Sequence, residues 1–287
     1  MPPFHPLPPP TPDTDAYRIW DGKEAGIDSY AGHCVVQTKG GSFPWDRAQI
    51  GAWEAKSVWW KRLDQHVKEA PEWMAGEAPQ GPFLVEEHGV HFEIDLRAGY
   101  SQGIFLDQRL NRLAVRNRAT PGSRVLNAFA YTCGFSVAAA LGGAVTTSLD
   151  LSVPYLEWGK RNFSANGLDA GEHYFTRGDV LDWMARWRKS GVRFDGIILD
   201  PPTFSRGGSR GVFRVEKDYQ DLVEAARELL APHGWMLCCT NFRGMSWEAF
   251  ESAVWNGLGR RGRLERREMP PEYTAERYLQ SVWVELK

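Results

Sequence analysis

Beyond residue 122, short apolar runs alternate with longer amphipathic segments, which predicts strands and helices in regular succession. The expected strands are Arg124–Phe129, Val145–Leu149, Tyr174–Thr176, Phe194–Leu199 and Trp235–Thr240. The expected helices are Gly134–Leu141, Val153–Asn166, Val180–Lys189 and Lys217–Leu230. The alternating end of the chain, Arg277–Leu286, predicts a closing antiparallel strand. Together these elements predict an α/β fold, with a doubly wound, mostly parallel, seven-stranded sheet covered on both faces.

The first hundred or so residues follow a different pattern. Residues 1–15 are rich in proline and predict a disordered tail. Residues 16–80 predict a small Trp-rich α+β module, in which the spacing of the tryptophans favours a helix over 47–70. Residues 81–102 predict a connecting, substrate-facing β-hairpin that turns near His88 and Gly89. The larger domain is expected from 103 to 287, opening with the amphipathic helix FLDQRLNRLAVRNRA.

Composition narrows the class of protein. The 287 residues are 43% apolar and 24% charged with a net charge of −2, which is typical of globular proteins and excludes a globally basic nucleic-acid binder. No apolar run is long enough for a membrane helix, and the N-terminus lacks the pattern of an export signal. The four cysteines have no metal-ligand spacing, so we expect reduced thiols, no metal and a cytoplasmic location.

The first strand-to-helix turn, VLNAFAYTCGFSVAAA, indicates what kind of ligand the sheet binds. Only Gly134 stands between strand and helix, so the glycine pattern of dinucleotide sites is missing. S-adenosylmethionine has no phosphate and needs no such pattern, and a helix N-terminus can hold its carboxylate. Asp150 ends the next strand, about 20 residues after Asn127, as a ribose-binding acid would.

Two further acids, Asp179 and Asp200, stand at the tips of later strands. Helix capping explains any single one of these acids equally well, and for Asp179 capping and adenine binding are equally supported. Three acids at the same edge of a parallel sheet favour one shared binding crevice, in which Leu151 and Val180 flank two of them.

Residues Phe83 to about Ser252 resemble the Rossmann-fold, S-adenosylmethionine-dependent 23S ribosomal RNA methyltransferases of the large-subunit K and I types. The segments that carry the resemblance are GIFLDQRLNR, VLNAFAYTCGFSVAAALGGA, SLDLSVPYLEWGKRNFSANGL and FDGIILDPPTFSR. The resemblance implies a methyltransferase domain over 103–287. It also implies cofactor contacts by Gln108, Arg109, Asn127, Ala130, Tyr131, Gly134, Asp150, Asp179 and Asp200. Residues 1–80 do not resemble the PUA domain that opens the I type, and Cys133 replaces the small residue usual in the family.

The methylated atom is either a nitrogen or carbon 5 of cytosine. Carbon methylation requires a cysteine nucleophile, and the position of that cysteine in the I type aligns with Asn241 here, which favours nitrogen and guanine N7. Cys239 keeps the carbon alternative open. Asp200 and the Pro201 carbonyl are expected to hold the base, with Pro202 fixing their direction and Phe204 stacking on it.

Arg206, Arg210 and Arg214 lie on a Gly-rich stretch after Phe204, which we interpret as a mobile loop that binds RNA phosphates. A second group of arginines, at 260, 261, 263, 266 and 267, fits a phosphate-contacting edge or a solvated turn equally well. The N-terminal tryptophans are expected to form the core of their module.

The leading hypothesis is therefore a methyltransferase acting on 23S rRNA or a large-subunit precursor. The alternatives are cytosine-C5 methylation, methylation of a protein or small molecule, and an RNA-assembly protein without turnover. A homodimer is left open.

Overall fold

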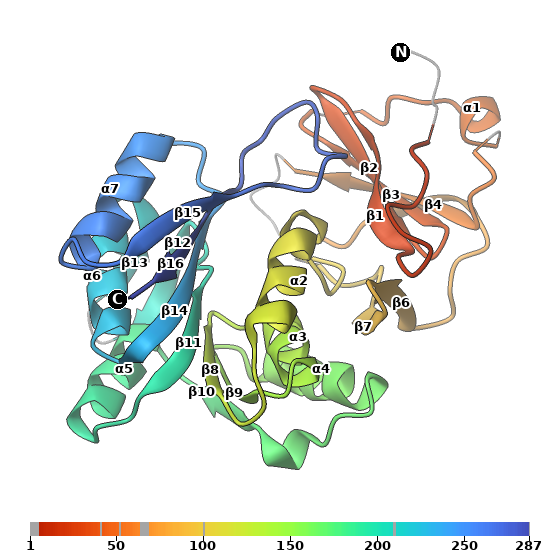
Figure 1. The fold of residues 1–287 in the computed structure, drawn as a ribbon. Helices are drawn as coiled ribbons and strands as arrows, with labels where there is room; N and C mark the ends of the chain where they lie inside the picture. Colours follow the sequence, from red (N-terminus) through yellow and green to blue (C-terminus); the bar gives the residue numbers. More distant parts are fainter. Residues whose placement is uncertain are drawn as a thin grey trace. The chain divides into compact units, whose positions relative to one another are not determined.

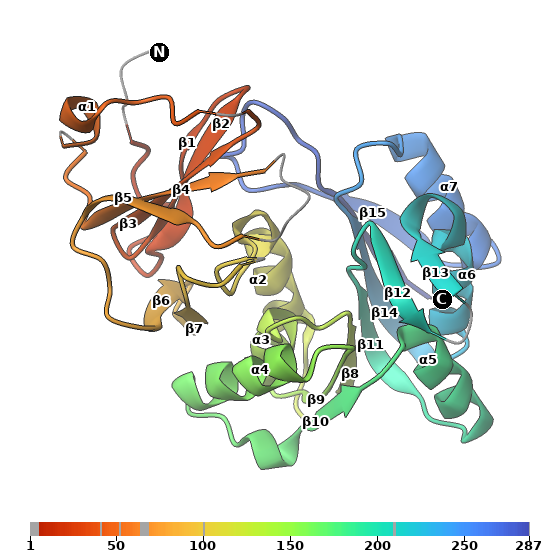
Figure 2. The ribbon, with the colours of Figure 1, turned by 180° about the vertical axis from the view of Figure 1, so that it is seen from behind.

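The computed structural model describes residues 6–40, 42–51, 53–63, 69–99, 101–208 and 211–286. The chain forms two compact units (Figures 1 and 2). The first contains Met1–Arg109 and Pro270–Arg277, and the second contains Leu110–Met269 and Tyr278–Lys287. The boundary thus lies later than the predicted change at residue 103, and a segment from near the C-terminus joins the first unit.

The first unit is built on a five-stranded sheet, called here the N-terminal sheet. Its strands, in spatial order, are β1 (Ala16–Asp21), β2 (Ala25–Tyr30), β3 (His33–Thr38), β4 (Ser57–Arg62) and β5 (Glu72–Gly76). One face packs into an apolar cluster that includes Ile27, Val36 and Trp45. The prediction that the tryptophans form this module's core is confirmed for Trp45, whereas Trp73 is 51% exposed.

The predicted helix over 47–70 is wrong. The helix α1 (Arg47–Gly51) is a single short element, and Glu54 adopts a left-handed φ of 54° that no helix continues through. Ser57 begins β4, which pairs in parallel with β3. The sequence Ser-Val-Trp-Trp favours a strand because branched and aromatic side chains pack well on a pleated surface. Residues 64–68 of the predicted helix lie outside the described residues.

The described part of the proline-rich segment, residues 6–15, differs from the predicted disordered tail, and residues 1–5 of that prediction lie outside the described residues. The Leu7 N–H donates to the Ile19 carbonyl at 2.8 Å, and Asp15 exchanges main-chain and side-chain hydrogen bonds with Glu86. Glu86 lies on β6 (Phe83–Glu87), which pairs with β7 (Val90–Ile94). This pair confirms the predicted hairpin, and its turn residues His88 and Gly89 have φ of 50° and 73°.

The second unit contains a seven-stranded sheet, the large sheet, in the order β10-β9-β8-β11-β14-β16-β15. Its strands are β8 (Arg124–Ala128), β9 (Val145–Asp150), β10 (Tyr174–Arg177), β11 (Phe194–Leu199), β14 (Leu230–Thr240), β15 (Arg263–Arg267) and β16 (Gln280–Glu285). The first five strands in this order are parallel, and β16 and β15 are antiparallel to their neighbours. The predicted α/β fold and closing antiparallel strand are confirmed.

Helices cover both faces of the large sheet. The bounds are η1 (Leu106–Gln108), α2 (Arg109–Arg118), α3 (Gly134–Leu141), α4 (Val153–Ala165), η2 (Ala170–Glu172), α5 (Val180–Lys189), α6 (Val215–Arg227) and α7 (Trp247–Gly257). Figures 1 and 2 show α2, α3 and α4 on one face and α5, α6 and α7 on the other. The sequence reading missed α7, β15 and a short hairpin of β12 (Phe204–Gly208) and β13 (Gly211–Arg214).

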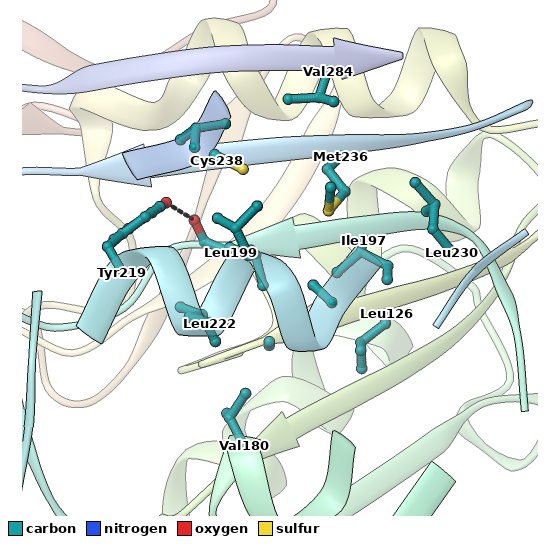
Figure 3. Close-up of a cluster of buried hydrophobic side chains, with 14 of the residues drawn as sticks. Leu126, Val180, Ile197, Leu199, Tyr219, Leu222, Leu230, Met236, Cys238 and Val284 are labelled. Atoms are coloured by element: carbon teal, nitrogen blue, oxygen red, sulfur yellow. Dashed lines mark hydrogen bonds between the residues drawn. The ribbon is translucent and has the colours of Figure 1, made fainter. Parts of the chain in front are cut away.

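The core of the second unit lies between the large sheet and α5, α6 and α7. Alternate residues of the central strands, such as Leu126, Ile197 and Met236, point toward Leu222 and its neighbours on α6 (Figure 3). These strands are buried on both faces, which explains their nearly continuous apolar sequences. In the described residues, no helix has the length and apolar character needed to cross a membrane.

Candidate active site

The candidate active site lies at the carboxyl ends of the parallel strands. β8 is flanked by β9 on one side and β11 on the other, so the chain reverses its direction of winding between β8 and β11. Open α/β sheets bind ligands at this switch point, outside the carboxyl ends of the strands. Asp150 is the last residue of β9 and Asp200 directly follows β11, so both predicted acids stand at this edge.

The loop between β8 and α3 has an unusual backbone. Phe129, Tyr131 and Cys133 have φ of 61°, 49° and 63°, so three non-glycine residues in five positions adopt the left-handed conformation. Each such residue costs about 1–2 kcal/mol, and strain of this kind persists only where surrounding contacts enforce it. Here the Ala130 N–H donates to the Leu149 carbonyl at 3.0 Å, and the Cys133 N–H donates to the Ala130 carbonyl at 2.8 Å. Strained backbone concentrates at functional sites, so this loop marks the edge as more than a connection.

Asp150 fixes the same loop from the neighbouring strand. One carboxylate oxygen accepts from the Tyr131 N–H at 2.8 Å, and the other accepts from the Ser152 N–H at 2.8 Å. Burial raises the pKa of Asp150, and the main-chain N–H groups lower it in part. Among the described residues no cation pairs with this carboxylate. Each oxygen can accept further hydrogen bonds, which is what hydroxyls of a ligand require.

The other half of the switch point is held by Tyr219 on α6. Its hydroxyl lies 2.9 Å from the Cys239 carbonyl and 3.3 Å from the Leu199 carbonyl, to which it can donate (Figure 3). This buried tyrosine therefore joins the ends of β11 and β14, directly before Asp200 in the chain. Pro201 is buried and Pro202 exposed, so the two prolines lead the chain outward from the sheet with restricted backbone freedom.

Comparison with known proteins shows which family has this arrangement. A family model described as S-adenosylmethionine-dependent methyltransferase matches residues 48–277. The chain belongs to this family. A putative ribosomal RNA large subunit methyltransferase of Bacillus subtilis is 34% identical over 84% of this chain and 65% of its own length. A ribosomal RNA large subunit methyltransferase of Deinococcus radiodurans is 32% identical over 96% of this chain and 73% of its own length. The chain thus spans about two thirds of the length of these relatives.

Solved structures agree with the family assignment. A putative methyltransferase crystallised with S-adenosylhomocysteine matches with a TM-score of 0.87 at 29% identity, covering 96% of this chain and 76% of that one. A putative S-adenosylmethionine-dependent methyltransferase of Streptococcus mutans matches with a TM-score of 0.85 at 28% identity, over the same shares of the two chains. The expected cofactor of the methyltransferase fold is therefore S-adenosylmethionine.

The residues at the sheet edge fit this cofactor. The strained loop has no glycine cradle for phosphates, and the cofactor has no phosphate to bind. The α3 helix begins at Gly134, where free N–H groups of the first helical turn can meet a carboxylate. Asp150 supplies carboxylate oxygens that can accept from ribose hydroxyls. In the described residues, no group of three or more His, Cys, Asp and Glu side chains is arranged to hold a metal ion.

Asn127, a predicted cofactor residue, makes a hydrogen bond within the fold that the sequence did not reveal. The Asn127 amide is 1% exposed and donates to the Ser136 hydroxyl at 3.0 Å, which ties β8 to α3. Ser148 donates to the same hydroxyl at 2.7 Å and brings β9 into this network. The network explains the buried polar residue at the end of β8.

The residues beside the other strand-tip acids divide between binding and packing. Asp179 caps α5 by accepting from the Asp182 N–H at 3.1 Å, so the capping alternative holds for this acid whatever else it binds. The side chain of Val180 lies in the hydrophobic core (Figure 3), which leaves only its main chain available to a ligand. Leu151 is 39% exposed and Ala130 is buried.

Gln108 and Arg109 belong to the first unit. Both are buried, and the Arg109 Nη2 lies 2.8 Å from one carboxylate oxygen of Glu272 and 2.9 Å from the other. Glu272 sits in the C-terminal segment that joins this unit, and burial raises its pKa while Arg109 lowers it in part. Arg109 and Glu272 are far apart in the sequence, and no pattern links them, so Glu272 was not predicted as a partner of Arg109.

The cysteines are placed as packing residues. Cys133 is fully buried against Gly159, and burial raises its pKa to about 12. Burial also raises the pKa of Cys238 to about 12. Cys239 is fully buried, with the Asn111 amide nitrogen 3.9 Å from its sulfur. Cys133, which stands where the family usually has a small residue, is therefore a packing side chain.

The mobility of the stretch after Pro202 stays a prediction. In its described residues the stretch contains paired strands, which the sequence did not predict. It forms the β12–β13 hairpin, in which Arg206 lies on β12 and Arg214 ends β13. Phe204, Val212 and Phe213 are aromatic or β-branched, and such side chains favour strands. Arg210 lies outside the described residues. Asn241, which follows β14, is exposed.

The second group of arginines is engaged in protein contacts. Arg266 on β15 forms a bidentate pair with Glu251 at 2.7 Å and stacks over Trp247. Arg263 and Arg267 both lie near Glu265. This charge pattern protects an exposed edge strand from pairing with another chain, which favours the solvated alternative.

Proposed function

We propose that this chain transfers the methyl group of S-adenosylmethionine to a base of large-subunit ribosomal RNA, with guanine N7 as the favoured acceptor. The observation that carries the proposal is Asp150, a half-buried strand-tip carboxylate held by main-chain N–H groups beside a strained loop. Support for the RNA substrate comes from the relatives, which are named as ribosomal RNA large subunit methyltransferases.

In the proposed cofactor site, Asp150 accepts from the ribose hydroxyls and Asp179 accepts from the adenine amine. The start of α3 at Gly134 and the main chain of Ala130 and Tyr131 hold the amino-acid end. The Asn127 amide keeps this loop in place through Ser136. Leu151 and the main chain of Val180 flank the site. Gln108 and Arg109 stay predicted contacts on the strength of the family resemblance alone.

When bound, S-adenosylmethionine supplies a methyl group that its sulfonium has already activated. The enzyme then needs to exclude water and align the acceptor lone pair with the carbon–sulfur bond. Guanine N7 carries no proton, so no side chain has to act as a general base. Asp200 and the Pro201 carbonyl orient the base, Pro202 restricts their movement, and Phe204, which is 57% exposed, offers a stacking face.

The cysteines give the reason for favouring nitrogen over cytosine C5. Methylation at C5 requires a thiolate that adds to the pyrimidine ring, and a thiolate forms readily only at an accessible site with a low pKa. Cys239 is fully buried, and the neighbouring Cys238 has its pKa raised by burial to about 12. An exocyclic amine is a further nitrogen acceptor, because Asp200 and the Pro201 carbonyl can accept its hydrogens.

The test is methyl transfer from labelled S-adenosylmethionine to unmodified large-subunit rRNA, followed by mass spectrometry of the nucleosides. We expect one methylated guanosine, and Asp200→Ala should lower the rate by at least about 100-fold while its circular dichroism stays unchanged. Asp221→Ala, which removes an exposed carboxylate on α6, is the matched control and should act like the wild type.

The same measurement on rRNA from cells that lack the protein separates the alternatives. Loss of a methylguanosine supports the proposal, and loss of 5-methylcytidine supports the carbon alternative. Unchanged rRNA contradicts both and leaves a protein or small molecule as substrate. Full activity of Asp200→Ala would contradict its proposed role.

A further inference from the structure

The β12–β13 hairpin has two different faces. Phe204 pairs with Arg214, Ser205 with Phe213, and Arg206 with Val212. Residues directly opposite each other, and residues two apart along one strand, point to the same face of an antiparallel pair. Phe204, Val212 and Arg214 therefore share one face, and Ser205 and Phe213 share the other.

The inner face is anchored to the candidate active site. The Phe213 ring lies 5.9 Å from the ring of Phe129, the first left-handed residue of the strained loop. At the base of the hairpin, the Val215 N–H donates to the Thr203 carbonyl at 3.2 Å, and Val215 itself is buried in the core. These contacts hold the hairpin beside the carboxyl edge of the large sheet.

The outer face is exposed and combines apolar groups with positive charge. Phe204 is 57% exposed and Val212 is 44% exposed, and Arg214 is exposed as well. Arg214 adds a positive charge to this face, and its main-chain N–H donates to the Asp218 carboxylate at 2.7 Å. Aromatic rings that stack on bases, set among arginines that contact phosphates, are what single-stranded nucleic acids bind.

We propose that the outer face of the β12–β13 hairpin binds a single-stranded segment of RNA that flanks the methylated base. This inference rests on the proposed function and adds the form of RNA that the enzyme selects. Paired bases in an A-form duplex cannot stack on a protein ring, because their faces are covered and the major groove is too narrow for side chains. Phe204 then stacks on the methylated base itself, as proposed above, while Val212 packs against the neighbouring unpaired base and Arg214 contacts a phosphate of the same strand.

The test is fluorescence anisotropy of the S-adenosylhomocysteine-bound protein with a labelled 12-nucleotide oligouridylate, measured at several salt concentrations. Each phosphate contact to a single strand contributes about 0.7 to the slope of log K against log salt. Arg214→Gln should weaken binding about 5-fold to 10-fold at low salt and make the slope shallower by about 0.7. Val212→Asp, which adds a negative charge to the same exposed face, should weaken binding by at least as much.

The matched control is Arg263→Gln, which removes an arginine with a side chain 72% exposed at the other edge of the large sheet. It should change neither the affinity nor the slope. Equal effects of Arg214→Gln and Arg263→Gln would overturn the proposal. Equal binding of a 12-base-pair duplex RNA, equal competition by polyglutamate, or no binding of the oligouridylate would overturn it as well.

The outcome is separable from that of the proposed function. If the oligouridylate binds as expected but rRNA is never methylated, the hairpin surface stands and the proposed function fails. If rRNA is methylated at the wild-type rate by Arg214→Gln, with unchanged binding and an unchanged salt slope, the proposed function stands and the hairpin surface fails.

Discussion

Asp28 and Asp150 are both acids on strands, but their surroundings differ. Asp28, on β2 of the N-terminal sheet, is 3% exposed and pairs with the Arg18 guanidinium at 2.8 Å. The Gln37 amide donates to its second oxygen at 2.6 Å, and Arg18 in turn stacks over Tyr273. Asp150, at the end of β9, is met by main-chain N–H groups and, among the described residues, by no cation.

The difference separates a structural charge from one available to a ligand. A buried carboxylate with a cationic partner has its charge compensated inside the fold, and removing either partner leaves the other uncompensated. A carboxylate held by N–H groups is oriented but keeps its net negative charge. Burial raises the pKa of Asp150, so keeping this carboxylate ionised lowers the stability of the folded chain, as is common at functional sites. The following predictions test this contrast.

The largest effect is expected from Asp28→Ala. The variant removes two charged hydrogen bonds of Arg18 and leaves Asp21 as its acidic partner. Because each bond to a charged group is worth about 1.5–3 kcal/mol, the free energy of unfolding should fall by about 3–5 kcal/mol in urea denaturation. The dissociation constant for S-adenosylhomocysteine, measured below the unfolding transition, should stay within about twofold, because substitutions at independent sites usually add to within about 0.3–0.5 kcal/mol. Weakened cofactor binding without a loss of stability would contradict the assignment of Asp28 as a structural charge.

Asp150→Ala should show the reverse pattern. Loss of hydrogen bonds to a charged acceptor is worth about 1.5–3 kcal/mol, so the dissociation constant should rise about 10-fold to 150-fold in calorimetric titration. The free energy of unfolding should fall by less than about 2 kcal/mol, because removal of a half-buried, unpaired charge offsets part of the loss of the two N–H hydrogen bonds that hold the strained loop. Asp169→Ala is the control: Asp169 also accepts from the N–H two residues ahead, that of Gly171, but it is exposed.

The affinity for S-adenosylhomocysteine should also depend on pH through Asp150. Burial raises the pKa of this carboxyl, and the ionised form is the one that accepts from hydroxyls. Affinity should therefore fall by up to about tenfold per pH unit on acidification, starting above the usual range for an aspartate. Stability should change in the opposite direction, because a raised folded-state pKa adds stability at low pH that is lost as pH rises through it. Asp150→Asn should abolish this acid limb, and a limb that persists in the variant would assign it to another group.

The smallest effect is expected from Cys239→Ser. A thiol that packs in a buried strand should cost about 1 kcal/mol when replaced, so kcat/KM for methyl transfer should fall by less than about tenfold. A nucleophile would lose activity by several orders of magnitude in the same assay. Such a loss, together with a covalent RNA adduct in the wild type, would restore the cytosine alternative.

The fold of the second unit could be predicted largely from the sequence because its central strands are buried on both faces. The strand Phe194–Leu199 and the helices Gly134–Leu141 and Val180–Lys189 end where the pattern predicted. The predicted helix over 47–70 was wrong because Val58, Trp59 and Trp60 also favour a strand, and pairing of β4 with β3 decided between the two. The β12–β13 hairpin was missed because its glycines were interpreted as mobility.

The candidate site could be predicted only in outline. Acids at strand tips are visible in the sequence because strands are, and parallel strands bring their ends to one edge. The left-handed conformations of Phe129, Tyr131 and Cys133 could not be predicted, because left-handed positions are normally recognised by a glycine and none of these residues is glycine. The Tyr219 contacts and the Arg109–Glu272 pair join residues that are distant in the chain, and a single sequence does not contain that information.

Hydrogen exchange with and without S-adenosylhomocysteine tests the central claim directly, because it needs no substitution. We expect the ligand to slow exchange in residues 127–134 and 150–152, where the strained loop and Asp150 lie. Strands β1 to β5, with the compensated Asp28, should exchange at unchanged rates. Protection concentrated in the N-terminal sheet, with none at 127–134 or 150–152, would contradict the account.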